Sequence, residues 1–594
     1  MALRQAAVES MQLPTEHWVR AAALADVTPG PCSVVHVEGR TLAIVRDNGR
    51  IFAVDNRCPH MGFPLDRGSV CDGILTCHWH HARFDLATGG TFDQWADDVQ
   101  AYPVEVREGE LWIDLAQRVD SRQHHLERLQ VGLERNIPLV IGKAVLPLVA
   151  SDPRAIEPFQ IGLEFGTRYR RAGWGQGLTI HACLRNLLPW LDPDDQPRAV
   201  FPGLSAVAND CDGEPPRFSV RPLPAASAEP AILKRWFRQF IEVRDAEGAE
   251  RCIASAVRAG ADSRQMAGML FAAATDHRYI DIGHPLDFTN KALEALDVAG
   301  WKYAEPALTS LASLYASAER MEESNEWRHP IDLVALVEAA FEDLPAVLEK
   351  GRGRQQEWRV PDSFVPCLLS EDPRAIVAGL LDALRNGCAA VELSGLVVYA
   401  AALRIAQFPT SNEFRDWDTA LHSFTFANAV QQGLRRSESP DLLRGVFDAA
   451  MSVYLNRFLN VPAVPIPQAD AVVTEPDELL RQLPALLDQR HQVNPAGQLV
   501  VDFLTGGGDP GRLMATLGRL LLREDRDFHT IQMLEAAFRQ HQLLRGSPAG
   551  THVLTAAARY LAAHSPTMRS QEQTWRIAYR LYHGQKTYET PDET

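Results

Sequence analysis

The sequence predicts a multidomain protein in which a small all-β domain is followed by a large, mostly α-helical region with an internal duplication. Three observations lead to this fold class. Short β-rich runs alternate with tight-turn signals up to about residue 116. Ala- and Leu-rich segments with helical spacing fill most of the remaining chain. Several short motifs of this second region recur later in the same order.

Length, charge and cysteine usage limit the classes of protein that fit. The chain has 594 residues, which is too long for a single hydrophobic core. Its formal net charge of −17 argues against nucleic-acid and anionic-membrane partners, and its longest apolar run, 393–403, is too short to span a bilayer. Nine scattered cysteines and an N-terminus without an apolar signal segment predict a cytoplasmic protein.

The β-rich region carries two pairs of metal-binding residues between its predicted hairpins. One segment contains Cys58-x-His60, and the other contains Cys77-x-x-His80. Two thiolates and two imidazoles could hold one tetrahedral zinc ion. A mixed Cys–His pair on each of two loops of a β scaffold fits a [2Fe–2S] cluster better, because there two sulfurs bind one iron and two imidazoles bind the other.

These two segments resemble the Rieske domain family over roughly residues 15–116. The resemblance implies that a [2Fe–2S] cluster is held by four ligands: Cys58, His60, Cys77 and His80. His78 then occupies a position that carries no ligand. His81 stands where the family commonly has glycine, which is a departure from the family pattern.

Four further positions bear on the redox potential that the resemblance implies. High-potential members of the family carry an additional pair of cysteines where this chain has Phe63 and Trp79, and hydroxyl groups where it has Ala82 and Phe84. Hydrogen bonds to the cluster stabilise its more negative reduced state, so their loss lowers the potential. We therefore predict a potential near the bottom of the Rieske range of roughly −150 to +300 mV, as in Rieske ferredoxins and ring-hydroxylating oxygenases.

Recurring motifs divide the helical region into two related halves. Asp152-Pro-Arg-Ala-Ile recurs from Asp372, and Glu229-Pro230 recurs as Glu475-Pro476. The matches stay in order along the chain, as a duplication with insertions requires. The predicted organisation is a Rieske domain at 15–116, a linker helix at 117–139, a helical half at 140–345, a linker at 346–364 and a second helical half at 365–594.

The duplication pairs four histidines, which we predict to be catalytic. His181 pairs with His422, because each follows a tryptophan and precedes an asparagine, and His284 pairs with His529, because each follows an acidic and arginine-containing stretch. All four are expected near helix starts. If the halves pack about a pseudo-twofold axis, the four rings could converge beside carboxylates as an iron site or a polar substrate pocket. Alternatively, these histidines cap helices or pack locally.

Two motifs that suggest cofactor sites do not fit their context. Asp281-x-x-His284 resembles a step of a two-histidine, one-carboxylate iron site, but Thr289 stands where the second histidine would follow. Residues 506–511 match G-x-G-x-x-G, but helical segments flank them, so we predict an inter-helix turn rather than a dinucleotide site. Electrons must then come from a separate reductase or ferredoxin.

Two functions fit these features. The first is an oxidoreductase in which a low-potential Rieske cluster passes single electrons to a helical catalytic region, for oxygenase-type chemistry on a small organic, aromatic or quinone substrate. The electron acceptor would be an additional non-haem iron or a redox-active substrate. The stretch "IDIGHPLDF" resembles a His-Pro-Leu stretch of helical enzymes similar to questin oxidase. The alternative is a non-enzymatic redox sensor or electron-transfer protein with a helical-repeat scaffold.

Overall fold

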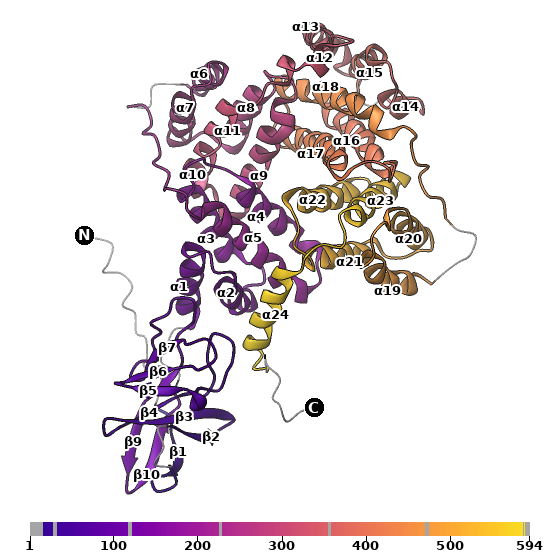
Figure 1. Ribbon diagram of the computed structural model, residues 1–594. Helices are drawn as coiled ribbons and strands as arrows, with labels where there is room; N and C mark the ends of the chain where they lie inside the picture. Colours follow the sequence, from indigo (N-terminus) through magenta and orange to yellow (C-terminus); the bar gives the residue numbers. More distant parts are fainter. Residues whose placement is uncertain are drawn as a thin grey trace. The chain divides into compact units, whose positions relative to one another are not determined.

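The computed structural model describes residues 16–27, 32–116, 121–224, 229–354, 358–469, 475–585 and 587. The chain divides into two compact units: unit 1 contains residues 1–154 and 573–594, and unit 2 contains residues 155–572. The predicted fold class is confirmed, since a small β domain precedes a large helical region (Figure 1). Within the described ranges, no helix is long and apolar enough to cross a membrane.

The β domain of unit 1 consists of three small antiparallel sheets with the strand orders β1-β10-β9, β2-β3-β4-β8 and β5-β6-β7. Their hairpins turn at residues in the left-handed conformation, such as Asn48 and Gly49, as the Asp-Asn-Gly signal predicts. The strands are β1 (Trp18–Ala23), β2 (Cys32–Val37), β3 (Arg40–Asp47), β4 (Arg50–Asp55), β5 (Ser69–Cys71), β6 (Ile74–Thr76), β7 (Arg83–Asp85), β8 (Ala101–Tyr102), β9 (Val104–Arg107) and β10 (Glu110–Asp114).

Strand β3 separates two hydrophobic cores. Alternate side chains point to opposite faces of a strand. Leu42 and Ile44 therefore pack into one core, while Ala43 and Val45 pack into the other. The second core also contains Cys58 and the loop strands around it, so the metal-ligand segments are anchored on the face of the sheet that carries Ala43 and Val45.

Among the described residues of unit 1 there are three α-helices: α1 (Ser121–Glu134), α2 (Pro138–Ser151) and α24 (Ser570–Tyr582), which belongs to unit 1 from Gln573 onward. Helix α1 lies within the predicted linker helix at 117–139, whose residues 117–120 lie outside the described part of the chain and whose last two residues begin α2. Pro138 begins α2, where a proline costs no hydrogen bond because the first amides of a helix have no partner within it.

Unit 2 is helical. Its first helices are α3 (Ile156–Arg168), α4 (Gln176–Leu187), α5 (Gln196–Cys211), α6 (Pro230–Glu242), α7 (Ala246–Arg258), α8 (Ser263–Ala274), α9 (His284–Ala299), α10 (Ala304–Thr309), α11 (Ala312–Ser317), α12 (Asn325–Arg328) and α13 (Leu333–Gly351). They are followed by α14 (Phe364–Leu368), α15 (Pro373–Arg385), α16 (Ala390–Ala406), α17 (Phe414–Arg436), α18 (Pro440–Leu455), α19 (Pro476–Leu487), α20 (Val493–Thr505), α21 (Pro510–Leu522), α22 (Phe528–Leu543) and α23 (Pro548–Ala563). The glycine-rich residues 506–511 span the turn between α20 and α21, as predicted.

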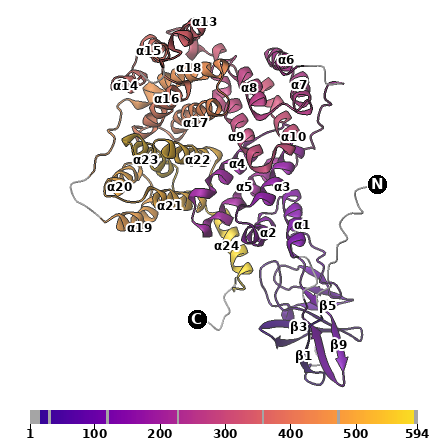
Figure 2. The same cartoon turned by 180° about the vertical axis from the view of Figure 1, so that it is seen from behind.

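The order of helices in the first half recurs in the second. Helix α6 begins at Pro230 and α19 at Pro476, 246 positions later, while α8 begins at Ser263 and α21 at Pro510, 247 positions later. Helices of each half also pack against helices of the other half: α4 contacts α22, and α17 contacts α9 (Figure 2). A pseudo-twofold axis that relates the halves produces such a reciprocal pair of contacts. The division at 346–364 stays a prediction, because unit 2 contains most of both halves.

Buried charges lie between the two halves. The Lys291 ammonium on α9 donates to Glu535 on α22 at 2.6 Å and to Glu294 at 3.1 Å, and the side chains of Lys291 and Glu535 are only 2% and 1% exposed. Arg539 pairs with both carboxylates. Burial alone would raise the Glu535 pKa, but Arg539 and Lys291 lower it to about 2. The two halves therefore share one charge network.

We expect Lys291→Met to lower the free energy of unfolding by about 3–5 kcal/mol, because two buried carboxylates would lose their ammonium partner. Urea unfolding followed by far-UV circular dichroism measures the loss, and Lys302→Met, at an exposed position, is the control with a change of about 0.5 kcal/mol or less. Since the Glu535 pKa is depressed, the contribution of its carboxylate is present at neutral pH and is lost as the pH falls toward 2. Equal losses in both variants would contradict a shared network.

Candidate functional site

The two loops that carry the predicted cluster ligands have the same backbone hydrogen bonds. In loop 1 (58–63) the Cys58 amide donates to the Phe63 carbonyl at 2.8 Å, and in loop 2 (77–82) the Cys77 amide donates to the Ala82 carbonyl at 2.8 Å. Each loop folds back on its own cysteine. Loop 1 follows β4, and loop 2 joins β6 to β7. Two similar turns thus each present one cysteine and one histidine.

A left-handed residue closes each of these turns. Gly62 has a φ of 81° and donates its amide to the Cys58 carbonyl, while His81 has a φ of 63° and donates its amide to the Cys77 carbonyl. A glycine adopts this conformation without steric cost, and other residues pay about 1–2 kcal/mol for it. His81 therefore occupies a glycine-type backbone position, and its side chain is exposed to solvent.

The four predicted cluster ligands lie together and suit the donor set of a mixed-ligand [2Fe–2S] cluster. Cys58 and Cys77 are buried next to each other, and the hydrogen bond between them lowers the pKa of the Cys77 thiol and raises the pKa of the Cys58 thiol. The rings of His60 and His80 lie 4.8 Å apart between centroids. The Nδ1 atom of His60 is buried and has no hydrogen-bond partner, which fits a nitrogen reserved for iron.

The two loops differ in their surroundings. His80 and Trp79 of loop 2 are exposed, so this loop is open to a redox partner. Beside loop 1, the Lys143 ammonium from α2 donates to the Pro59 carbonyl at 2.9 Å. Its charge is partly offset by Asp97, whose carboxylate lies 3.8 Å away. A cation of the chain thus lies next to the cluster-binding loop.

Apolar groups occupy the positions where high-potential relatives carry sulfur or hydroxyl groups. Ala82 and Phe84 are fully buried in the core beside Cys77. The rings of Phe63 and Trp79 face each other across the two loops with centroids 5.7 Å apart. None of these four side chains carries a hydroxyl group, which is the feature from which the low potential is predicted. The potential itself stays a prediction.

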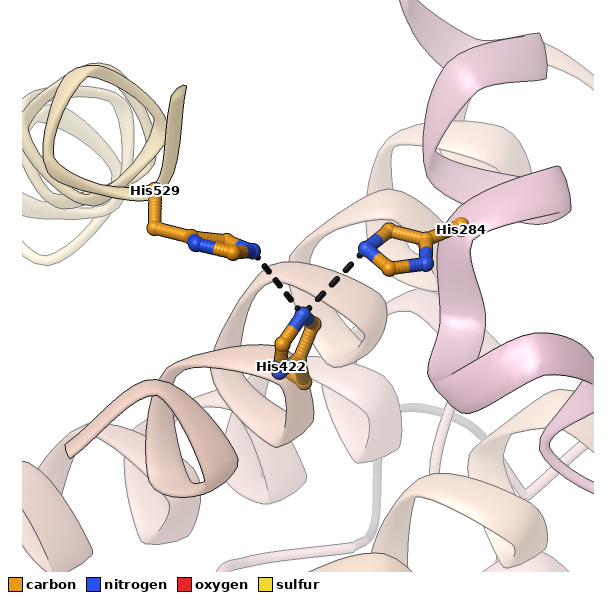
Figure 3. A group of neighbouring side chains, drawn as sticks. All are labelled: His284, His422 and His529. Atoms are coloured by element: carbon orange, nitrogen blue, oxygen red, sulfur yellow. Dashed lines mark hydrogen bonds between the residues drawn. The ribbon is translucent and has the colours of Figure 1, made fainter. Parts of the chain in front are cut away.

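Three of the four predicted catalytic histidines converge in unit 2. The Nε2 atom of His422 lies 3.2 Å from Nε2 of His284 and 3.1 Å from Nε2 of His529 (Figure 3). All three rings offer a nitrogen within 4.8 Å of the others. His284 begins α9 and His529 is the second residue of α22, as the predicted helix starts require, whereas His422 lies well inside α17.

The other nitrogen of each ring faces an oxygen. Nδ1 of His284 lies 3.8 Å from Asp281, and Nδ1 of His529 lies 3.9 Å from Asp418, distances of ion pairs rather than direct hydrogen bonds. The His422 ring bonds to the backbone of Asp418, one turn earlier on α17. The Tyr560 hydroxyl donates to the Asp418 carboxylate at 2.6 Å and holds it in place. Burial lowers the pKa of His422 to about 3, so this ring is neutral near pH 7.

The backbone before His284 is strained. Tyr279, Asp281 and Ile282 have φ values of 41°, 44° and 47°, and Gly283 follows at 99°. A β-branched residue such as Ile282 rarely adopts this conformation, and each such residue costs of order 1–3 kcal/mol. A Cβ atom on Gly283 would lie 2.8 Å from Phe426, so only glycine fits there. This segment sets the position of His284 at the start of α9.

His181, the fourth predicted histidine, does not join the other three. It lies in the interior of α4, where its Nε2 atom is 3.1 Å from the Phe159 carbonyl and its ring stacks on Phe159 with centroids 4.6 Å apart. A difference in helix register explains why His181 lies apart. The asparagines of the two motifs, Asn186 and Asn428, both hydrogen-bond to side chains of the central helices α9 and α22, and they are 242 positions apart. His181 and His422 are only 241 positions apart. One residue corresponds to about 100° around a helix, so His181 points elsewhere.

Sequence reasoning missed the carboxylate of Asp418. A signal for it exists, because Asp418 stands four residues before His422 and neighbouring turns of a helix bring such residues together. Its contact with His529, by contrast, joins α17 to α22, and no local pattern predicts it.

Comparisons with known proteins concern the N-terminal domain. The family model described as Rieske [2Fe-2S] domain matches residues 17–103. The ferredoxin component of the naphthalene 1,2-dioxygenase system of Pseudomonas putida is 33% identical over 103 residues, which are 17% of this chain and 99% of that protein. The ferredoxin component of the p-cumate 2,3-dioxygenase system of Pseudomonas putida is 34% identical over 79 residues, 13% of this chain and 67% of that protein.

Among solved structures, the ferredoxin of carbazole 1,9a-dioxygenase from Nocardioides aromaticivorans IC177 is 31% identical. It covers 16% of this chain and 96% of that chain, with a TM-score of 0.16. The family model and the ferredoxin relatives bear out the resemblance of the first domain, and the helical region stays unrecognised.

We expect a redox titration followed by electron paramagnetic resonance (EPR) to give a midpoint potential below zero. Lys143→Met should shift it to more negative values, because the ammonium beside Pro59 favours the more negative reduced cluster. Arg107→Met, on the exposed strand β9, is the control and should leave the midpoint unchanged. A midpoint above zero contradicts the low-potential assignment, and an unchanged midpoint in Lys143→Met contradicts the effect of its charge.

We expect His81→Gly to raise the stability of the first domain by about 1 kcal/mol, because glycine relieves the left-handed backbone at this position. Thermal loss of the visible absorption of the cluster measures the change. His78→Gly, at a neighbouring exposed position without a positive φ, should instead lower the stability. The interpretation of the turn is wrong if both glycine variants lose stability equally.

Proposed function

This chain belongs to the Rieske [2Fe–2S] domain family through its N-terminal domain, and from that premise we propose that it is an oxidoreductase whose cluster passes single electrons to the helical region. Four residues would hold the cluster: Cys58, His60, Cys77 and His80. When bound, the cluster supplies one-electron redox chemistry. The electron donor is a separate reductase or ferredoxin that docks at the exposed loop 2, where His80 reaches the surface.

The observation that carries this function is the convergence of His284, His422 and His529. Neutral imidazoles with oxygens behind them are the surroundings in which a non-haem iron or a bound redox-active substrate accepts electrons. Because the cluster domain and this centre belong to one chain, the effective concentration of the electron donor near its acceptor is raised. A clustered group of this kind favours an enzyme over a redox-sensing scaffold, in which the histidines would be spread over the surface.

The substrate class we propose is a small organic molecule, aromatic or quinone-like, and the reaction is of the oxygenase type. The relatives of the first domain support this class, since they are named as ferredoxin components of the naphthalene and p-cumate dioxygenase systems. The histidine group is also partly open, because the side chains of His284 and His529 are each 22% exposed. A small molecule could therefore reach it from solvent.

The test is transient reoxidation of the reduced cluster. The full-length protein is reduced without oxygen and then mixed with oxygenated buffer that contains a panel of aromatic compounds and quinones, while the visible absorption of the cluster is followed. We expect at least one compound to accelerate reoxidation, and we expect His284→Ala/His529→Ala to slow that accelerated phase by about tenfold or more.

His552→Ala is the matched control, because this half-buried histidine of unit 2 bonds to Tyr399 at 2.7 Å and lies outside the histidine group. Its reoxidation rates should equal those of the wild type, and the EPR signal of the reduced cluster should be the same in all three proteins. Equal rates in the wild type and the double variant with every compound would overturn the proposed electron acceptor.

A further inference from the structure

We propose that His284, His422 and His529 form a binding site for one divalent first-row transition metal, which they hold through their three Nε2 atoms. The metal's redox role rests on the proposed function, but the metal site itself rests on the geometry of these rings. The three histidines come from α9, α17 and α22, and Figure 3 shows their Nε2 atoms directed at one another.

The arrangement of protons on these rings calls for a cation. A neutral imidazole carries its proton on one nitrogen and a lone pair on the other. The oxygens of Asp281 and Asp418 face the outer nitrogens of the three rings, and they favour the proton there. With the protons on the outer nitrogens, three lone pairs meet at the centre of the group, where the Nε2 atoms lie 3.1 and 3.2 Å apart. Three lone pairs that point at one another repel. A metal ion at their centre would be coordinated by all three, which removes this repulsion.

The His422 ring is buried and has an imidazole on each side, so a cation at the centre of the group would contact all three rings. The carboxylates of Asp281 and Asp418 lie on the far side of the outer rings, not among the Nε2 atoms. They compensate a central dication better than they compensate a proton shared by two rings.

The distances suit a metal of the first transition row. Such a metal binds imidazole nitrogen at about 2.0–2.1 Å, so ligand nitrogens in a facial or tetrahedral arrangement lie about 3.0–3.4 Å apart. Two of the three pairs already have this separation, and the third lies within 4.8 Å. A small rotation of the His284 or His529 ring completes the set, and both rings are at the solvent-accessible rim.

The donor set also indicates what else the metal binds. Imidazole ligands suit zinc, copper, iron and nickel, and three protein ligands leave at least one position open, as in catalytic rather than structural sites. Because the three ligands are neutral, the metal keeps its double positive charge, and an anionic oxygen ligand such as a phenolate, an enolate or hydroxide is favoured at the open position. In an electron-accepting role the metal is iron, which would take one electron from the cluster as Fe³⁺ and be left as Fe²⁺.

Metal content measured against labile sulfide tests the site in the full-length protein. A [2Fe–2S] cluster alone gives iron and labile sulfide at about 1:1, whatever its occupancy, while one additional iron per cluster raises the ratio to about 3:2. We expect the higher ratio, or about one zinc per chain, in protein purified without chelators. His284→Ala/His529→Ala should lose this excess metal and keep the EPR signal of the cluster.

His181→Gln is the matched control, because its ring lies in the counterpart helix and contacts Phe159 instead of the group. It should keep the excess metal. Anaerobic titration with Co²⁺ gives a second readout, since bound Co²⁺ absorbs in the visible range. The wild type should bind one equivalent, the double variant none, and Asp418→Asn about one equivalent with 10–100-fold weaker affinity.

The inference is overturned if the wild type takes up no Fe²⁺, Zn²⁺ or Co²⁺ beyond the cluster, or if the double variant keeps what the wild type binds. These results are distinguishable from a failure of the proposed function. Metal bound at the three histidines without any compound-dependent reoxidation would leave the site in place and remove the function. Compound-dependent reoxidation in protein without excess metal would support the proposed function and remove the metal site.

Discussion

The buried ammonium of Lys291 is the constraint on which the helical region depends. A charge in that position is tolerated only when carboxylates surround it, and here one comes from α9 itself and the other from α22 of the second half. Pairing the Lys291 ammonium with both carboxylates fixes how α9 and α22 are aligned along their lengths. His284 lies two turns before Lys291, and His529 lies just under two turns before Glu535, so the same register places both histidines at one end of the helix pair.

The chain uses one construction twice, at two scales. In the first domain, two loops with matching hydrogen bonds each supply a cysteine and a histidine. In the second unit, two related halves each supply a histidine at the start of a central helix. In both places the predicted ligands are held by backbone that leaves little freedom. Left-handed residues stand at Gly62 and His81 in the loops, and at Tyr279, Asp281, Ile282 and Gly283 before α9. Rigid backbone lets weakly bonded side chains remain close together.

Sequence reasoning predicted the elements that depend on local chemistry. The spacing of Cys58, His60, Cys77 and His80 pointed to the two matching loops, and helical spacing predicted the helical region. Its division into two halves with the predicted bounds stays a prediction. Sequence reasoning also selected the three histidines that converge, but it included His181, because a one-residue difference in register between α4 and α17 has no signature in composition. The strain at Ile282 and the contact of Asp418 with His529 arise from packing between segments that are distant in the sequence. Local sequence patterns do not predict such contacts.

The difference in register between α4 and α17 has an evolutionary consequence. In a freshly duplicated protein the two halves are equivalent, and either could be replaced by a second copy of the other. Here His422 has a partner residue in α4, Ile180, that carries no imidazole, while His181 packs on Phe159 instead. A homodimer assembled from the first half would therefore lack the central imidazole, whereas the second half carries both His422 and His529, the counterpart of His284. The two halves have thus become unequal in what they contribute to the histidine group.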